Sequence, residues 1–196
     1  MKRGLTDIID AKRGTTQINK IMRGTTLIWE KVVGFNDPVI IIPSGTNQIP
    51  APDNVSHASW NREAVTVQQF AEYSEMTTIA ASKAKGVHIQ GAPNLTVICE
   101  FQDAGYGSII LAVGRGAEAR YGGSYTFQND TLTVPAGGVG ITLQRERLPD
   151  GWVKLRVDST SASGLHDNFV IQWVAADGPS EVGVKARFRN PKMFYN

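Results

Sequence analysis

The chain has 196 residues, which is enough for one domain or for one domain with a small appendage. Only 19% of the residues are charged and 20 are glycine, a balance that argues against disorder, a coiled coil and an ordinary helical enzyme. No apolar run approaches the ~20 residues of a membrane-spanning helix, and the opening Met1–Asp7 lacks the apolar stretch of a signal peptide. A single cysteine, Cys99, excludes a disulfide within one chain and fits assembly in a reducing cytosol.

Charge is distributed unevenly along the chain. Residues 1–34 contain seven Lys or Arg and three Asp or Glu, a net charge of +4, whereas residues 35–196 contain thirteen and fifteen, a net charge of −2. A basic arm therefore precedes a slightly acidic body, and such an arm could meet nucleic acid or an acidic protein surface. Because its charges are spaced among Thr and Ile, we do not expect nucleic acid to be the partner.

The arm is an internal repeat with a period of ten residues. Its three units are Lys2–Ile8, Lys12–Ile18 and Met22–Ile28, and each contains Arg-Gly, a later Thr and an Ile at the same spacing. Glycine followed by β-branched residues indicates a turn followed by a strand. The clearest hairpin has the turn Arg23-Gly24, where glycine supplies the positive φ that such a turn needs.

Three short strands in a thin ribbon cannot bury their own apolar side chains. The arm is therefore either a meander packed on its own domain or an anchor that adds strands to a neighbouring subunit. The sequence favours the anchor. The residues expected to carry it are Ile8, Arg13, Ile18, Ile21, Arg23, Gly24, Ile28 and Trp29.

Residues 35–62 contain four prolines and several Gly, Asn and Asp, a composition typical of an extended, semi-rigid connector. One apolar run, Val39–Ile42, could form a strand within it. We therefore divide the chain into an arm at 1–34, a Pro-rich connector at 35–62 and a folded body at 63–196.

The body alternates apolar and polar residues with period two, the pattern of half-buried strands. Glycine-rich and Asn/Asp turns separate the segments. This pattern predicts about ten short strands and no helix, hence an all-β antiparallel sandwich of the jelly-roll type. The expected strands are Val65–Phe70, Val87–Gln90, Leu95–Phe101, Ser108–Val113, Ser124–Phe127, Thr131–Val134, Ile141–Arg145, Val153–Val157, Phe169–Trp173 and Val182–Phe188.

Two parts of the chain resemble known families. Leu148–Val157, Phe169–Val174 and Val184–Lys192 together resemble the last three strands of jelly-roll, carbohydrate-binding-like domains, which are frequent in bacteriophage tail and fibre proteins. Ile18–Lys31 is similar to the short hairpin at the start of many phage minor tail proteins. The resemblance implies a component of a virion, assembled in the host cytoplasm, and it identifies no ligand.

Residues with catalytic or metal-binding chemistry form no recognisable motif. The three histidines are far apart, Cys99 falls among inward positions, and the carboxylates include no pair selected by a glycosidase pattern. Asp150, Asp158, Asp167 and Asp177 could hold a structural calcium ion but are better explained as turn residues. We expect no cofactor, no metal and no enzymatic activity.

Glycan recognition in a sandwich relies on aromatic faces combined with Arg, Asp and Asn hydrogen bonds. The candidates near glycine-rich turns are Tyr106, Arg115, Arg120 and Tyr121. Tyr125, Trp60, Trp152 and Trp173 are expected in the core instead.

The sequence thus predicts a non-enzymatic phage structural protein of the tail tip, baseplate or fibre. Its arm would contact other virion proteins, its copies would form a homo-oligomer, and its jelly roll could contact a host-envelope glycan without entering a membrane. The alternatives are a capsid decoration or head-fibre protein that stabilises the shell and, less favoured, a secreted glycan-binding module.

Overall fold

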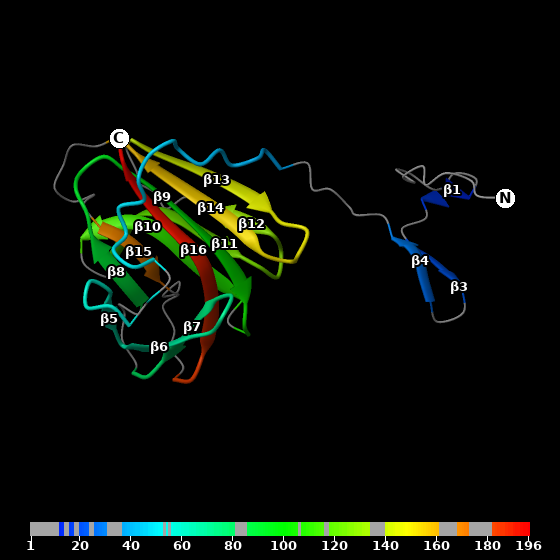
Figure 1. Ribbon diagram of the computed structural model, residues 1–196, viewed down its shortest axis with the longest axis horizontal. Coiled ribbons are helices and arrows are strands. Elements are labelled where there is room, and N and C mark those ends of the chain that lie inside the picture. The colour runs from blue at the N-terminus through cyan, green and yellow to red at the C-terminus, as the bar shows by residue number, and fades with distance from the viewer. Residues whose placement is uncertain are drawn as a thin grey trace. The chain divides into compact units, whose positions relative to one another are not determined.

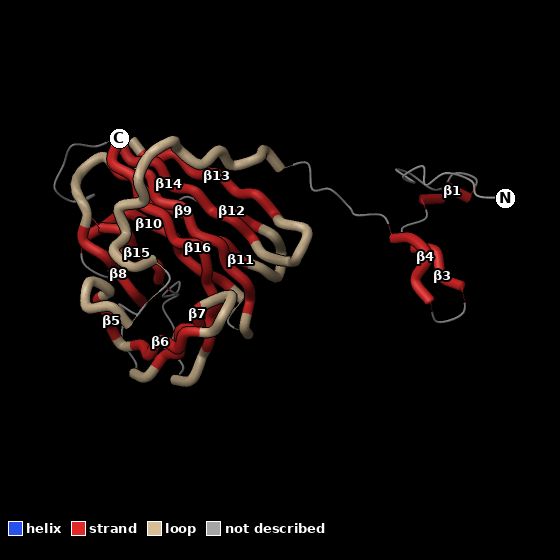
Figure 2. Tube along the Cα trace, in the orientation of Figure 1, coloured by secondary structure: helices blue, strands red, loops and turns tan. Residues whose placement is uncertain are grey.

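The structure is a computed structural model that describes residues 37–52, 54, 56–80, 86–105, 107–115, 118–133, 140–160, 168–172 and 182–196, and the backbone of four short strands before residue 31. The chain divides into two compact units, Met1–Asn36 and Asp37–Asn196. Strands, turns and extended segments account for all of the described residues (Figures 1 and 2). No helix in this part of the chain is long and apolar enough to cross a membrane.

The first unit contains two antiparallel hairpins of the same design. Their strands are β1 (Lys12–Arg13), β2 (Thr16–Gln17), β3 (Lys20–Arg23) and β4 (Thr26–Glu30), paired β1 with β2 and β3 with β4. In both hairpins the arginine of an Arg-Gly-Thr-Thr sequence pairs with the threonine three residues later. The second and third units of the ten-residue repeat therefore each form a hairpin, and the first, Lys2–Ile8, lies outside the described residues.

The predicted hairpin is confirmed, but its connection lies one residue later than expected. Arg23 belongs to β3 and is the partner of Thr26, so the two connecting residues are Gly24 and Thr25. Gly24 and Thr25 themselves lie outside the described residues.

The second unit is a sandwich of two six-stranded antiparallel sheets. The first, called here the β9 sheet, has the order β13-β14-β9-β16-β7-β6, with the bounds Ile141–Arg147, Val153–Ser159, Leu95–Asp103, Lys185–Tyr195, Ser74–Thr78 and Val65–Gln69. The second, the β10 sheet, has the order β12-β11-β10-β15-β8-β5, with the bounds Thr131–Thr133, Glu118–Thr126, Ser108–Arg115, Asn168–Gln172, Gly86–Gln90 and Asn61–Glu63.

The chain crosses repeatedly between the sheets. Strand β8 of one sheet leads to β9 of the other and then back to β10, and β14, β15 and β16 alternate in the same way (Figure 1). Every pair of neighbouring strands is antiparallel. The predicted jelly-roll sandwich is thereby confirmed.

The core lies between the two sheets and uses alternate residues of each strand. In β14, Val153, Leu155 and Val157 are buried in it, and the intervening side chains point away. Trp60 is 2% exposed and meets the ring of Phe169 edge-on at 6.0 Å between centroids, as expected of a core residue. Period-two patterning therefore predicted the inner faces of the sheets well.

Two strands escaped the sequence pattern because their residues are polar. Strand β7 contains Ser74, Glu75 and Thr78, all buried, around a single apolar core residue, Met76. Strand β5 is a short and fully exposed edge. Neither shows the apolar alternation by which the other strands were recognised.

Residues 37–49, called here the strap, run along the sandwich (Figure 1). Ile40 and Ile49 are each 3% exposed, and Ile40 packs with Ile98 and Phe194 on the outer face of the β9 sheet. The Gln48 N–H donates to the Met193 carbonyl at 2.8 Å. The sequence assigned the strap to a connector ending at residue 62, whereas the division between compact units lies between residues 36 and 37.

Candidate functional site

Three of the four glycan-binding residues proposed from the sequence lie in the paired strands β10 and β11: Arg115 in β10, and Arg120 and Tyr121 in β11. Tyr106 lies outside the described residues, and only the backbone of Arg115, Arg120 and Tyr121 is described. Arg115 ends β10 and pairs with Glu118, whereas Gly107 precedes the first residue of that strand. The glycan-binding role of these four residues stays a prediction.

The anchoring residues are described in part. Arg13, Ile21 and Arg23 lie in β1 and β3, and Ile28 and Trp29 in β4, where Trp29 pairs with Ile21. Ile8, Ile18 and Gly24 lie outside the described residues. The anchoring role stays a prediction.

The outer face of the β9 sheet carries rows of charged side chains that run across its strands. One row joins Glu146, Lys154, Glu100 and Arg189, which are successive cross-strand neighbours on four adjacent strands. Their charges alternate in sign across about 14 Å of sheet. Lys154 Nζ lies 3.1 Å from Glu146 Oε2, and Arg189 Nε lies 2.7 Å from Glu100 Oε2.

Aromatic rings lie beside this row, and each of two arginines, Arg189 of the row and the nearby Arg187, lies over one of them. The loop between β6 and β7 stacks Phe70 on Tyr73 with 4.8 Å between ring centroids. The Arg187 guanidinium lies 5.0 Å from the centre of the Tyr73 ring, and that of Arg189 lies 4.2 Å from the centre of the Trp152 ring. Cations over aromatic faces at these distances are attracted by the ring quadrupole. We call this group, Phe70, Tyr73, Trp152, Arg187 and Arg189, the cation–aromatic face.

Ion pairs orient the arginines of this face. Glu75 accepts from Lys185 Nζ at 2.7 Å and from Arg187 Nε at 3.0 Å, and Arg187 also donates to Gln102 at 3.2 Å. The hydrogen bond from Lys185, helped by Arg187 and opposed by burial, lowers the pKa of Glu75. The carboxylate is therefore ionised at neutral pH and holds the Arg187 guanidinium by an ion pair.

Arg189 has a similar set of partners. Its Nη2 lies 2.5 Å from Asp150 Oδ2 while its Nε contacts Glu100, so two carboxylates fix its plane above Trp152. Burial acts to raise the pKa of Asp150, but the hydrogen bonds from Arg189 and from the Trp152 N–H outweigh it and lower the pKa. Trp152 is only 6% exposed and lies beneath Arg189, so it presents little surface to a ligand. Phe70 and Tyr73 are half-buried and provide the apolar surface of this face that a ligand can reach.

Sequence reasoning missed this face. Trp152 was expected in the core, and it is buried, but beneath Arg189 on the outer side of the sheet. The sequence could have predicted the outward position of Trp152, because Lys154 and Arg156, two and four residues later, point outward and alternate residues of a strand lie on the same face. Tyr73 gave no signal, since the strand that follows it was not recognised.

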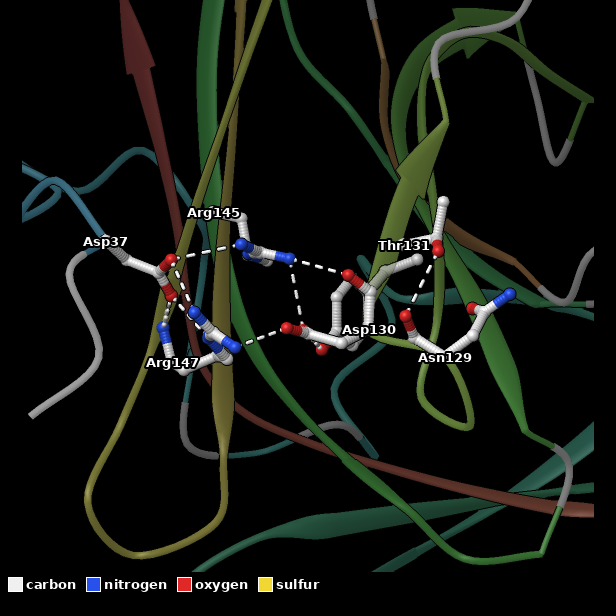
Figure 3. A network of polar contacts seen from close by, with 7 residues as sticks. Asp37, Asn129, Asp130, Thr131, Arg145 and Arg147 are labelled. Carbon is white, nitrogen blue, oxygen red and sulfur yellow. Dashed lines mark hydrogen bonds and ion pairs between the residues drawn. The ribbon is translucent and has the colours of Figure 1, made fainter. Parts of the chain in front are cut away.

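A second polar cluster fixes the start of the strap (Figure 3). Asp37 accepts from Arg145 Nη2 at 3.0 Å and from Arg147 Nε at 2.8 Å, and both arginines also contact Asp130. Tyr125, which is 2% exposed as expected of a core residue, donates its hydroxyl to Asp130. Arg145 and Arg147 belong to the edge strand of the β9 sheet and Asp130 to the β11–β12 turn of the other sheet. The cluster, called here the strap lock, thus joins the strap and both sheets.

The strap lock is strongly polarised. The hydrogen bond from Arg147 is the largest influence on Asp37 and, with Arg145 and against the effect of burial, lowers the pKa of this carboxyl to about 2. The Asp37 side chain is 7% exposed, so the charges meet where water screens them little. We read this cluster as structural, because it fixes the position at which the strap begins.

The cysteine and the aspartates considered above as possible reactive or metal-binding residues are the last candidates from the sequence. Cys99 is fully buried, its thiol donates toward the Arg189 carbonyl at 3.4 Å, and burial raises its pKa well above the usual range. Asp158 accepts from Arg156 and Thr96, whereas Asp167, Asp177 and Trp173 lie outside the described residues. Within the described ranges no group of His, Cys, Asp or Glu is arranged to hold a metal ion.

Comparisons with known proteins add little beyond the fold class. No family model and no curated protein matches the chain. The solved structures that resemble it include a tyrosine-to-alanine and an arginine-to-alanine mutant of CBM29-2, a family 29 carbohydrate-binding module. They are 12% and 11% identical, each with a TM-score of 0.40, and the match covers 69% of this chain and 81% of theirs. The likeness is too low to carry over a ligand or a site.

Proposed function

We propose that this chain is a non-enzymatic structural protein of a bacteriophage particle that presents a glycan-binding sandwich. The repeated hairpins of residues 12–30 would attach it to other virion proteins, and the cation–aromatic face would bind the glycan. The observation that carries the binding role is this face, in which Tyr73 and Phe70 lie beside the ordered guanidinium groups of Arg187 and Arg189.

The chemistry of the face suits a sugar. Aromatic rings can pack against the C–H faces of a pyranose ring, while guanidinium, amide and carboxylate groups exchange hydrogen bonds with its hydroxyls. The groups available are Arg187, Arg189, Gln102, Glu100 and Lys154. All five are already held in place by contacts with one another or with neighbouring side chains. Groups fixed before binding lose little conformational entropy on binding.

The ligand is expected to be neutral. Each cation of the face contacts a carboxylate, since Lys154 meets Glu146, Arg187 meets Glu75, and Arg189 meets Glu100. An acidic sugar would gain little from cations that are already paired and would be repelled by their partners. A neutral polysaccharide avoids this cost.

The attachment role is supported by the similarity of Ile18–Lys31 to the opening hairpin of phage minor tail proteins and by the separation of the arm as its own compact unit. The core residues described for the sandwich lie between Ile49 and Met193, within the second compact unit. Attachment and binding can therefore be tested separately.

The binding experiment uses residues 37–196 and a panel of neutral and acidic polysaccharides in affinity gels, followed by calorimetry. We expect Tyr73→Ala to weaken binding to a neutral polysaccharide by at least about tenfold, the loss of one stacking partner. The matched control is Tyr195→Ala, which removes a tyrosine that is 50% exposed at the end of β16. If Tyr106→Ala with Tyr121→Ala abolishes binding while Tyr73→Ala does not, the site lies at those two tyrosines and not on this face.

The attachment experiment removes residues 1–34. The truncated chain should keep the thermal unfolding transition of the sandwich and fail to join particles, because the predicted anchor is gone. Gly24→Val should impair incorporation more than Lys20→Ala, since a Cβ at a tight hairpin connection is costly whereas one surface charge is not. An unchanged copy number in particles assembled with the truncated chain would reject the anchoring role and leave the binding role untouched.

A further inference from the structure

The strap carries an exposed apolar strip between two prolines. Val39 and Ile41 are each 75% exposed and Ile42 is 44% exposed, while Ile40, between them, is buried. The described part of the chain has only three other large apolar side chains with comparable exposure, and they are not consecutive in sequence. Such a concentration of exposed β-branched residues on an extended segment is typical of a contact surface.

The strip is held rigidly in this exposed position. The strap lock fixes Asp37, the Ile40 N–H donates to Glu146 Oε2 at 3.0 Å, and Arg156 donates to the Ile41 carbonyl. Burial of Ile40 against Ile98 and Phe194 turns Val39 and Ile41 outward. The sandwich thus presents the strip and does not cover it.

We propose that this strip, Val39, Ile41 and Ile42, packs against the same strip of a second copy of the chain and so forms a self-association contact. Two identical extended segments can meet antiparallel about a twofold axis, so that Val39 of one copy packs on Ile41 of the other and the reverse. The prolines at 38 and 43 limit the extended segment to the four residues 39–42, so the segments of two copies have the same length and can lie fully alongside one another.

The charges around the strip favour a second copy over a partner of opposite charge. The side chains that hold the strap are the bases Arg145, Arg147, Lys154 and Arg156 and the acids Asp37, Asp130, Glu146 and Asp158, four of each sign. Because their sum is zero, two copies do not repel one another here. A strongly charged partner would gain no net electrostatic attraction at this surface.

The strip is too small to form a stable interface by itself, so another part of the chain must contribute to self-association. Three side chains expose at most a few hundred Å², well below the roughly 800 Å² that each partner buries in a stable interface. Six residues, 31–36, connect the end of β4 to the strap, and two-stranded hairpins such as those of the arm are marginal alone in water. If the arms of two copies associate, the effective concentration of one strip near the other rises. Contact between the strips then stabilises the oligomer further.

The test is the oligomeric state of the full chain, measured by sedimentation equilibrium over a range of micromolar concentrations. We expect the full chain to self-associate and Ile41→Asp to raise its dissociation constant by at least about tenfold, because an aspartate would be buried against an apolar strip. The control is Val182→Asp, at a valine that is 65% exposed elsewhere on the sandwich and should leave self-association unchanged. Thermal unfolding should be the same for both variants, since neither side chain lies in the core.

Two results would overturn the proposal. A full chain that stays monomeric at every concentration would show that the strip meets the chain's own arm, a different protein or nothing. Self-association that Ile41→Asp and Val182→Asp leave equally strong would place the contact elsewhere. Both results leave polysaccharide binding by residues 37–196 unaffected and so distinguishable from it.

Discussion

The two faces of the β9 sheet are built from alternate residues of the same strands, but they obey different rules. Toward the core, Phe101, Leu155 and Phe188 are no more than 2% exposed and need only be apolar and of suitable size. On the other side Glu100, Lys154 and Arg189 have specific partners on neighbouring strands. The inner face can therefore be filled by any apolar side chains of suitable size, whereas the outer face around Arg189 depends on specific pairings between strands.

The largest effect is expected from comparing the stability cost of substitutions at two adjacent residues of β9, one on each face of the sheet. Phe101→Ala removes a ring that is 1% exposed and should reduce the free energy of unfolding of residues 37–196 by about 3–5 kcal/mol. Gln102→Ala, one residue further along β9, loses only a hydrogen bond from Arg187 and should cost about 1 kcal/mol or less. Urea unfolding of the two variants measures the difference, and similar costs would mean that the outer face is part of the stabilising core.

A smaller effect is expected from the strap lock and depends on pH. The pKa of Asp37 is lowered from 3.8 to about 2 in the folded state, so its contribution to stability is complete above about pH 4 and is lost as the pH falls toward 2. Because the partner side chains of Arg145 and Arg147 are 22% and 27% exposed and so keep part of their contact with water, we expect this contribution to be about 1–2 kcal/mol.

The matched variant for this prediction is Asp37→Asn, which keeps the shape of the side chain and removes its charge. It should be less stable than the parent at pH 7 and lose less stability between pH 4 and pH 2, as followed by urea unfolding at each pH. Parallel stability curves for parent and variant over this interval would show that the ion pairs with Arg145 and Arg147 contribute nothing.

The inner face could be predicted from sequence because it depends on local alternation. The segments Leu95–Phe101 and Val153–Val157 were recognised in this way, and both are strands in the structure. Strand β7 was missed because its buried residues include Ser74 and Glu75, whose burial depends on partners that are distant in sequence.

The outer face could not be predicted, because it depends on which strands are neighbours. Arg189 meets Glu100 and Asp150, residues 89 and 39 positions away, and no local pattern encodes such a meeting. The strap is a similar case, since its prolines indicated a connector while its contact with Arg147 spans 110 positions. Sequence gives the alternation of a strand, and topology decides what its outward residues touch.

The measurement that tests the binding face most directly is an NMR titration of isotope-labelled residues 37–196 with the neutral oligosaccharide that binds best. We predict that the largest shifts appear at Tyr73, Gln102 and Arg187 and at the side chains of Arg189 and Trp152, all on the outer side of the β9 sheet. Shifts confined to Tyr106, Arg115, Arg120 and Tyr121, with the cation–aromatic face unchanged, would contradict the account.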